Sequence, residues 1–340
     1  MRIFLVTDAW PPQVNGVVRT WTTVVGELRN AGHQVDIVEP GQYRTLPMPT
    51  YPEIRLALTT RGNVQKRIAA VEYDRIHIAT EGPLGMAARR ACARLGLNFT
   101  TSYHTRFPEY LAARAPVPLS WTYAWLRWFH NGGTACLVAT PKIAEDLRER
   151  GFNNLVAWTR GVDRDLFRPR QTGDLAERLG LGKPVFVSVG RVSVEKNLEA
   201  FLDLELPGSK LVVGDGPALE GFRQKYPDAV FVGAKAGEEL ALHYNLGDVF
   251  VFPSRTDTFG NVLLEAMACG LPVAAYPVPG PLDVVGDSGA GMLAEDLGKA
   301  AMAALEIPRE TALARAAQFT WSECTRIFLE SAPLRIRTAA

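Results

Sequence analysis

The sequence predicts an α/β protein made of two Rossmann-like, doubly wound domains. Short apolar runs without alternation recur along the chain, as expected of parallel strands that are buried on both faces. Each run is followed by a helical pattern, and this order of strand and helix begins again after about residue 168. The 340 residues are enough for two complete cores.

The composition is that of an ordinary globular protein, with 47% apolar and 21% charged residues. No run reaches the roughly 18 uncharged apolar residues of a membrane span. The apolar run at the N-terminus is too short for the core of a signal peptide, so we expect a cytoplasmic protein. The cysteines show neither pairing nor metal-ligand spacing, so buried thiols are expected at Cys92, Cys136, Cys269 and Cys324.

Charge is distributed unevenly between the two halves of the chain. Residues 1–167 contain 20 Lys and Arg against 14 Asp and Glu, whereas residues 168–340 contain 17 against 22. Either the first half alone faces an anionic surface or acceptor, or the difference is chance scatter of surface charge.

The first half is expected to open with a strand at residues 3–7 and a helix from about Val17 to Asn30. Apolar residues recur in this helix at helical spacing, and Gly32, a typical helix-ending residue, follows it. Gly16 lies at the start of the helix, where the missing Cβ lets a bound phosphate approach the backbone closely. An ordinary turn residue is the alternative interpretation.

Further strands are expected at residues 76–79, 99–103 and 137–140. His104 directly follows the second of these, at the strand end where a doubly wound sheet binds its ligands. A structural histidine at the surface is the alternative.

Three tryptophans follow in the helical segment WTYAWLRWFH. Trp121, Trp125 and Trp128 form one stripe of the helix because they are four and three residues apart. The stripe either packs into the core or lies at a membrane surface, where Trp favours the level of the headgroups. Neighbouring basic residues fit the membrane alternative: Arg106, Arg114, Arg127, Lys142, Arg148 and Arg150.

The second half opens with a strand at residues 184–190 that leads into the segment GRVSVEKN. Arg191 and Lys196 lie at the same strand end, where two cations can neutralise a diphosphate. The next strand, at 211–213, ends in a glycine-rich turn that lacks the helix-opening pattern of a dinucleotide site.

The stretch 253–276 predicts a polar loop, a helix that ends at Gly270, and a further strand. Asp257 and Glu265 are separated by seven residues, so one carboxylate lies at the helix entrance and the other about two turns inside. The first can meet a sugar hydroxyl and the second a ribose. For Asp257, capping of the following helix is the alternative role.

The segment DTFGNVLLEAMACGLPV resembles the signature of retaining nucleotide-sugar glycosyltransferases of family 4. These enzymes have the GT-B fold, in which two Rossmann-like domains face each other across a cleft. The family pattern carries two glutamates, and Asp257 replaces the first of them, which shortens its reach by one methylene. GRVSVEKN, SYHTRFPEYL and PPQVNGVVRT resemble further segments of the family.

The resemblance also implies the domain organisation. An acceptor-binding domain is expected at 1–167, and a nucleotide-sugar-binding domain at 168–320. The boundary follows GVDRDLFRP, which is similar to the run that ends the N-terminal domain in GT-B enzymes. A terminal helix in 321–340 is expected to cross back to the first domain.

The same resemblance assigns roles to individual residues. The catalytic set that it implies is His104, facing the donor sugar, Arg191 and Lys196 on the leaving diphosphate, and Asp257 and Glu265. Contacts to the nucleotide sugar are expected at Gly16, Gly190, Gly214, Asp215, Gly216, Val232, Ser254, Phe259, Gly260 and Asn261.

The implied reaction moves a hexosyl group from a nucleotide diphosphate sugar to a hydroxyl acceptor, with retention at the anomeric carbon. No second carboxylate is evident as a covalent nucleophile, so a front-face reaction is expected. The site region has no Asp-x-Asp pair, and we therefore expect no required metal and no other cofactor. UDP-glucose or UDP-glucuronate is the favoured donor, and GDP-mannose is the alternative.

Basic charge and the Trp stripe favour a membrane lipid such as diacylglycerol as acceptor, with a saccharide as the alternative. The protein would then be peripheral on the inner face of the plasma membrane, and no nucleic-acid partner is expected. Two other classes stay open. A non-hydrolysing sugar-nucleotide epimerase needs a carboxylate set that is not seen here, and the other class is a non-catalytic binding module or membrane scaffold.

Overall fold

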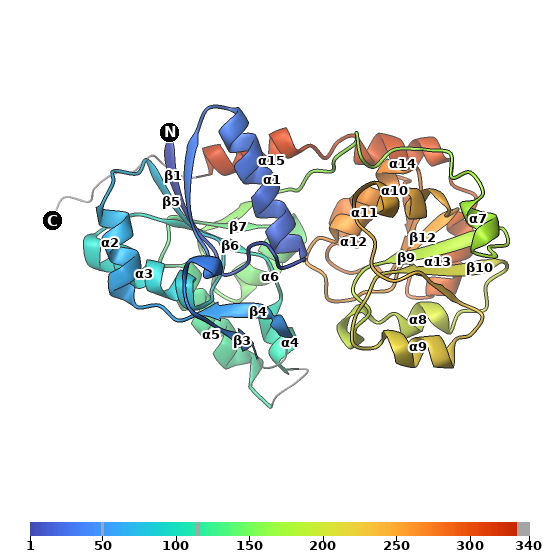
Figure 1. Cartoon of the computed structure of the whole chain (residues 1–340), viewed down its shortest axis with the longest axis horizontal. Helices are drawn as coiled ribbons and strands as arrows, with labels where there is room; N and C mark the ends of the chain where they lie inside the picture. The colour runs from blue at the N-terminus through green and yellow to red at the C-terminus, as the bar shows by residue number, and fades with distance from the viewer. Residues whose placement is uncertain (49–50, 113–115, 332–340) are drawn as a thin grey trace. The chain divides into compact units, whose positions relative to one another are not determined.

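The structure, a computed structural model, describes residues 1–48, 51–112 and 116–331. The chain divides into two compact units, each with its own parallel sheet (Figure 1). The first unit consists of residues 1–160 together with helix α15 (Trp321–Glu330), and the second unit is Gly161–Thr320.

The first unit contains a parallel sheet of six strands in the order β2-β1-β5-β6-β7-β8. The strands are mostly buried and apolar, as the runs without alternation predicted. Their bounds are β1 (Arg2–Val6), β2 (Gln34–Val38), β5 (Arg75–Ile78), β6 (Thr100–Tyr103), β7 (Ala135–Val138) and β8 (Leu155–Ala157).

Helices connect these strands, and an antiparallel pair of strands lies between β2 and the helix α2. The pair is β3 (Thr45–Met48) and β4 (Tyr51–Ala57), preceded by the short 3-10 helix η1 (Pro40–Gln42). The helices are α1 (Gly16–Asn30), α2 (Arg61–Ala69), α3 (Pro83–Leu95), α4 (Phe107–Ala112), α5 (Leu119–His130) and α6 (Pro141–Glu149).

Helix α1 begins where the sequence predicted. The side chain of Asn15 accepts hydrogen bonds from the backbone N–H groups of Val17 and Val18, which caps the first turn. The predicted apolar stripe is buried, with Trp21 fully covered, and Gly32 follows the helix with φ of +82°.

Helix α15 packs beside α1 in the first unit (Figure 1). The indole N–H of Trp158 donates to the carbonyl of Cys324 at 2.8 Å, and the Arg75 guanidinium donates to the carbonyl of Leu329 at 2.7 Å. Cys324 and Phe328 are buried in the same apolar cluster as Trp21. The returning helix expected from 321 onward therefore lies on the first unit, while residues 332–340 are outside the described residues.

The second unit repeats the architecture with strand order β11-β10-β9-β12-β13-β14, all pairs parallel. The strands are β9 (Val185–Val189), β10 (Ser209–Val213), β11 (Val230–Phe231), β12 (Val249–Phe252), β13 (Val273–Ala275) and β14 (Gly291–Leu293). The helices are η2 (Val194–Lys196), α7 (Leu175–Arg178), α8 (Glu199–Leu202), α9 (Leu219–Lys225), α10 (Gly237–Asn245), α11 (Asn261–Ala268), α12 (Pro281–Val284), α13 (Leu297–Ala304) and α14 (Arg309–Ala316).

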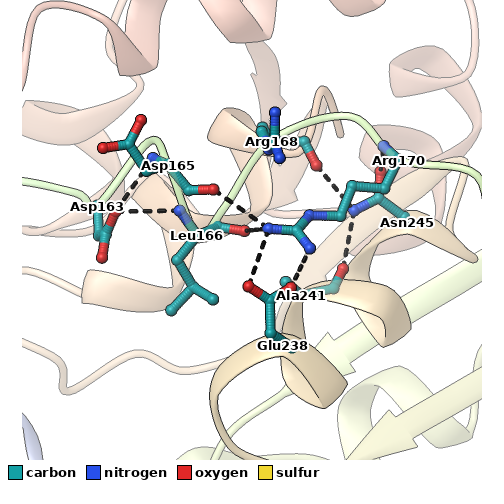
Figure 2. A network of polar contacts seen from close by, with 8 residues as sticks. All are labelled: Asp163, Asp165, Leu166, Arg168, Arg170, Glu238, Ala241 and Asn245. Carbon is teal, nitrogen blue, oxygen red and sulfur yellow. Dashed lines mark hydrogen bonds and ion pairs between the residues drawn. The ribbon is translucent and has the colours of Figure 1, made fainter.

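The segment before the expected boundary at residue 168 is fastened to the second unit. Figure 2 shows Arg170 at the centre of the contacts, donating to the carbonyls of Asp165 and Leu166 and pairing with Glu238 of α10. Asn245 accepts from the backbone N–H of Arg170 at 2.8 Å. The units divide between Arg160 and Gly161, so all of these residues belong to the second unit.

Candidate active site

Most of the residues expected to bind the donor gather at one edge of the sheet in the second unit. Strands β10, β9 and β12 are neighbours and parallel, so the loops that follow them meet at their carboxyl ends. These loops carry Arg191 and Lys196 after β9, Gly214 to Gly216 after β10, and Asp257 after β12.

Backbone in two of these loops is in direct contact. Gly190 and Gly214 have φ of +154° and +153°, and a Cβ on Gly214 would lie 1.8 Å from the carbonyl oxygen of Gly190. A Cβ on Gly216 would lie 2.3 Å from the carbonyl oxygen of Val192. The backbone N–H of Val192 donates in turn to the carbonyl of Asp215. Only glycine satisfies these distances, so the motif glycines set the shape of this edge.

The side chains of Lys196 and Asp257 form an ion pair, with Lys196 Nζ 2.5 Å from Asp257 Oδ1. Asp257 Oδ2 is buried and has no hydrogen-bond partner among the described residues. Two further bonds join the same loops, from Thr256 Oγ1 to the carbonyl of Glu195 and from Asn197 Nδ2 to the carbonyl of Pro253. Lys196 is therefore held toward the loop after β12.

Asp257 does not cap the helix that follows it. The N-cap position of α11 is Gly260, with φ of +80°, so the capping alternative for Asp257 is wrong. Asn261 is the first residue of α11, and Phe259 is buried against Phe319. Helix α11 and strand β13 otherwise follow the order that the sequence predicted.

Glu265 lies inside α11 and is only 2% exposed. Its Oε2 accepts a hydrogen bond from the Tyr244 hydroxyl at 2.8 Å, and the Tyr244 ring lies between Phe167 and Phe250. The sequence indicated a carboxylate facing a ribose, but it did not indicate Tyr244 as a partner. The bond fixes the Glu265 carboxylate at one oxygen.

The other expected donor contacts are distributed around this edge. Arg191 is exposed just after β9, and Asp215 is exposed with its Oδ1 accepting from the N–H of Gly216 at 2.7 Å. Ser254 is buried directly after β12, and Val232 follows β11 and is partly exposed. All of these lie in the second unit, whereas Gly16 is the first residue of α1 in the first unit.

His104 directly follows β6 in the first unit and is surrounded by aromatic side chains. Its Nε2 accepts from the indole N–H of Trp21 at 2.9 Å, and its Nδ1 lies 3.3 Å from Nη2 of Arg160. Burial lowers the pKa of His104 well below its usual value, and the positive charge of Arg160 lowers it further. His104 is therefore neutral near pH 7. The ring centroid of Trp158 lies 5.9 Å from that of His104. The sequence did not identify Arg160 or Trp158, because both are distant from His104 along the chain.

Two buried polar groups outside the predicted set lie at the same edge of the first sheet. Asp8 accepts from the backbone N–H groups of Leu84 and Gly85 at 2.9 and 3.2 Å, and burial raises its pKa. His130 Nε2 lies 3.1 Å from Glu81 Oε1. In the sequence, the feature that could have indicated this cluster was Asp8, a carboxylate directly after the first strand.

The Trp stripe of α5 is mainly outside the core. Trp121 is 71% exposed and Trp128 47% exposed, so core packing is wrong for both, while Trp125 is partly buried against the apolar cluster beneath α5. The core face of α5 is formed instead by Tyr123, Leu126, Phe129 and His130. Arg89 stacks over the Trp128 ring, with Cζ 3.6 Å from the ring centroid.

Several of the basic residues near this stripe have partners within the protein. Arg106 pairs with Asp146, Lys142 pairs with Glu145 at 2.9 Å, and Arg150 stacks over the Tyr123 ring. Arg114 lies outside the described residues. In the part of the chain that is described, no helix combines the length and apolarity needed to cross a bilayer.

Metal ligands are not grouped in the described ranges. Among these residues, no set of three or more His, Cys, Asp or Glu side chains lies close enough together to hold a metal ion. The expectation that no metal is required stays a prediction.

Comparison with known protein families gives two matches that together cover most of the chain. Residues 14–166 match the model of Glycosyltransferase Family 4, and residues 183–307 match Glycosyl transferases group 1.

Three curated relatives extend this comparison. The chain is 32% identical to sulfoquinovosyl transferase SQD2 of Arabidopsis thaliana over 84% of its length, and spans 61% of that protein. It is 30% identical to a GDP-mannose-dependent alpha-mannosyltransferase of Mycobacterium tuberculosis, covering 86% of this chain and 83% of the relative. An alpha-monoglucosyldiacylglycerol synthase of Streptococcus pneumoniae is 28% identical, covering 86% of this chain and 75% of the relative.

Two solved structures share the fold. Sucrose-phosphate synthase from Thermosynechococcus elongatus superposes with a TM-score of 0.75 at 22% identity, covering 97% of each chain. Anabaena HepE, solved in complex with UDP and glucose, superposes with a TM-score of 0.70 at 16% identity, covering 97% of this chain and 99% of that chain. The expected fold of two Rossmann-like, doubly wound domains is confirmed.

Proposed function

Because the chain belongs to glycosyltransferase family 4, we propose that it transfers a hexosyl group from a nucleotide diphosphate sugar to a hydroxyl acceptor with retention of configuration. The observation that carries this proposal is the edge of the second sheet. There, the loop after β9 carries two cations, Arg191 and Lys196. Its backbone contacts the loop after β10 where Gly190 meets Gly214. Cations and close backbone approach are what a diphosphate requires.

The barrier of such a reaction lies in breaking the bond between the sugar and the phosphate. Negative charge then develops on the diphosphate, and cations that are already in place stabilise it. Arg191 and Lys196 have this role in the proposal. In the first unit, we assign the neutral His104 to the donor sugar, as the family resemblance implies.

A front-face reaction fits the two carboxylates of the second unit. Asp257 Oδ1 is paired with Lys196, and the buried Glu265 accepts a hydrogen bond from Tyr244 at Oε2, so each carboxylate has an oxygen engaged with a protein group. A covalent glycosyl–enzyme intermediate needs a carboxylate that is open to the anomeric carbon. The geometry therefore favours transfer without such an intermediate.

Diacylglycerol is the acceptor that we propose first, with UDP-glucose or UDP-glucuronate as donor. The exposed Trp121 and Trp128 of α5 support a lipid acceptor, because Trp side chains bind at the headgroup level of a bilayer. The likeness to a monoglucosyldiacylglycerol synthase is consistent with this. Binding would be peripheral, at the inner face of the plasma membrane.

GDP-mannose is the second candidate donor. The likeness to the mycobacterial GDP-mannose-dependent enzyme extends over 83% of that relative, which is more than for the plant sulfoquinovosyl transferase. The acceptor would then be a lipid or a saccharide.

The test is incubation of the purified chain with radiolabelled UDP-glucose, UDP-glucuronate or GDP-mannose, with either diacylglycerol vesicles or soluble saccharides. A labelled lipid that forms with one donor identifies both substrates, and its anomeric configuration by NMR reports retention or inversion. Repeating the reaction with EDTA, and then with added Mg²⁺ or Mn²⁺, tests the expectation on metals. Consumption of none of the donors would overturn the proposal in favour of a binding module.

A matched pair of variants tests the site itself. Lys196→Ala should lower turnover by about a hundredfold, since it removes one group that stabilises developing charge. Lys183→Ala is the control, because Lys183 pairs with Asp248 at the amino ends of β9 and β12, whereas Lys196 lies beyond the carboxyl end of β9. Equal activity of the two variants would remove Lys196 from the mechanism.

A further inference from the structure

Two lysine–aspartate pairs connect the segments that flank β9 and β12. Lys183 and Asp248 precede the strands, with Nζ 2.8 Å from Oδ1, and Lys196 and Asp257 follow them. The first pair is the more open, because the side chain of Lys183 is 62% exposed, compared with 27% for Lys196. The two pairs share their chemistry, and only the second lies at the edge where the donor is expected.

The position of Asp257 is fixed from several sides. The neighbouring Thr256 is hydrogen-bonded to the carbonyl of Glu195. The backbone carbonyl of Asp257 packs closely against Gly280, where an added Cβ would lie 3.2 Å from the carbonyl oxygen. Its side chain is 17% exposed, and one oxygen, Oδ1, is on Lys196. The other oxygen, Oδ2, is buried and has no hydrogen-bond partner among the described residues.

A buried carboxylate oxygen without a hydrogen bond is unfavourable, because desolvation of that oxygen is not compensated. A group that brings a hydroxyl to Asp257 would relieve this cost. A diphosphate brings no hydroxyl. It also adds negative charge next to Asp257, whose carboxylate is already paired with the ammonium group of Lys196.

We propose that Asp257 is a competing counter-ion of Lys196 that makes the site favour the intact donor over the spent nucleoside diphosphate. The inference rests on the proposed function. A bound diphosphate competes with Asp257 for Lys196, and the carboxylate then lacks a partner. With the intact donor, a sugar hydroxyl donates to that carboxylate and offsets the loss. With the nucleoside diphosphate alone the repulsion is uncompensated, so the product binds more weakly and leaves.

Neutral substitutions at Asp257 give the sharpest prediction. Asp257→Asn and Asp257→Ala should each bind the free nucleoside diphosphate about tenfold more tightly than wild type, because the competing charge is gone. Affinity for the intact donor should rise less or fall, so the ratio of the two dissociation constants moves toward one. Asp257→Glu keeps the charge, and its diphosphate affinity should stay within about twofold of wild type.

The experiment is calorimetric titration of the full chain with UDP and GDP, and with UDP-glucose and GDP-mannose. Asp248→Asn is the matched control, since it removes the same charge from the pair at the other edge, and it should leave every dissociation constant unchanged. Combining Asp257→Asn with Lys196→Ala should abolish the tightening, which shows that Asp257 acts through Lys196.

Two negative outcomes are distinguishable. A wild-type chain that binds no nucleoside diphosphate and no nucleotide sugar would overturn the proposed function. A wild-type chain that binds them, with Asp257→Asn and Asp257→Ala binding the diphosphate no more tightly, would overturn the role of Asp257 alone. The neutral variants are checked for folding by circular dichroism, and either folded variant is sufficient for the comparison.

Discussion

The carboxyl edges of the two sheets are built by different means. In the second unit, backbone forms the edge, with Gly214 against Gly190 and Gly216 against Val192. In the first unit, side chains form it, among them the buried Asp8 and the partly buried His104, whose partners come from distant parts of the chain. An edge made of backbone requires glycine at fixed places in a short segment, and an edge made of side chains requires only that several strands and helices meet. The first kind is visible in a sequence, and the second is not.

The largest expected effect is at the backbone edge. Gly214→Ala places a Cβ 1.8 Å from the Gly190 carbonyl oxygen at a φ of +153°, and should lower the free energy of unfolding of the second unit by about 3 kcal/mol or more. Gly221→Ala is the control. Gly221 lies within α9, a Cβ there meets nothing within 4 Å, and we expect no loss or a gain of about 0.5 kcal/mol.

The tryptophans make this measurement specific. All seven lie in the first unit, so their fluorescence follows that unit during urea unfolding, while circular dichroism follows both units. Gly214→Ala should shift the dichroism curve more than the fluorescence curve. Equal stability of the two glycine variants would show that the loops after β9 and β10 can separate at little cost.

An intermediate effect is expected from pH at the side-chain edge. Burial lowers the pKa of His130, but the neighbouring Cys136 and Glu81 raise it by more, to about 10. Protonated His130 therefore stabilises the first unit fully below pH 6.5, and this contribution is lost as pH rises from 6.5 toward 10. Burial lowers the pKa of His77 and of His104 well below 6.5, so these two make the unit less stable as pH falls below 6.5.

The first unit should accordingly be most stable near pH 6.5, as measured by urea unfolding with tryptophan fluorescence between pH 5 and 10. His130→Gln should remove the decline on the alkaline side and leave the decline on the acid side. A decline above pH 6.5 that persists in this variant would mean that His130 is neutral in the folded protein.

The smallest effect on stability is expected at the surface of the first unit. Trp121→Ala should change the free energy of unfolding by less than about 0.5 kcal/mol, because the side chain is 71% exposed. It should nevertheless weaken sedimentation with anionic vesicles, whereas Leu58→Ala, at another exposed apolar residue of this unit, should not. Identical sedimentation of the two variants would remove the membrane role of α5.

The sequence predicted the second unit in more detail than the first. The order of β12, α11 and β13 followed from a polar loop, an apolar helix and the glycine after it, and the signature residues were located by their motifs. The Lys196–Asp257 pair was not predicted, since motif spacing gives the strand end of a residue and not its rotamer. Tyr244 was missed because it is one tyrosine within an amphipathic helix.

In the first unit, the strands and α1 were predicted from periodicity, but the surroundings of His104 were not. Trp21 belongs to the apolar stripe of α1, which indicated only packing, and Arg160 lies far along the chain from the histidine that it faces. The sequence did not decide whether the Trp stripe of α5 is buried or exposed, because three Trp at helical spacing are equally compatible with a core and with a surface.

The return of α15 to the first unit has a consequence for biosynthesis. Phe328 and Cys324 complete a core whose other members, such as Trp21 and Leu5, leave the ribosome some 300 residues earlier. The second unit is continuous in sequence and can acquire its native packing while the nascent chain is still growing. The unit translated first is therefore the second of the two to complete its core, because that core includes Cys324 and Phe328.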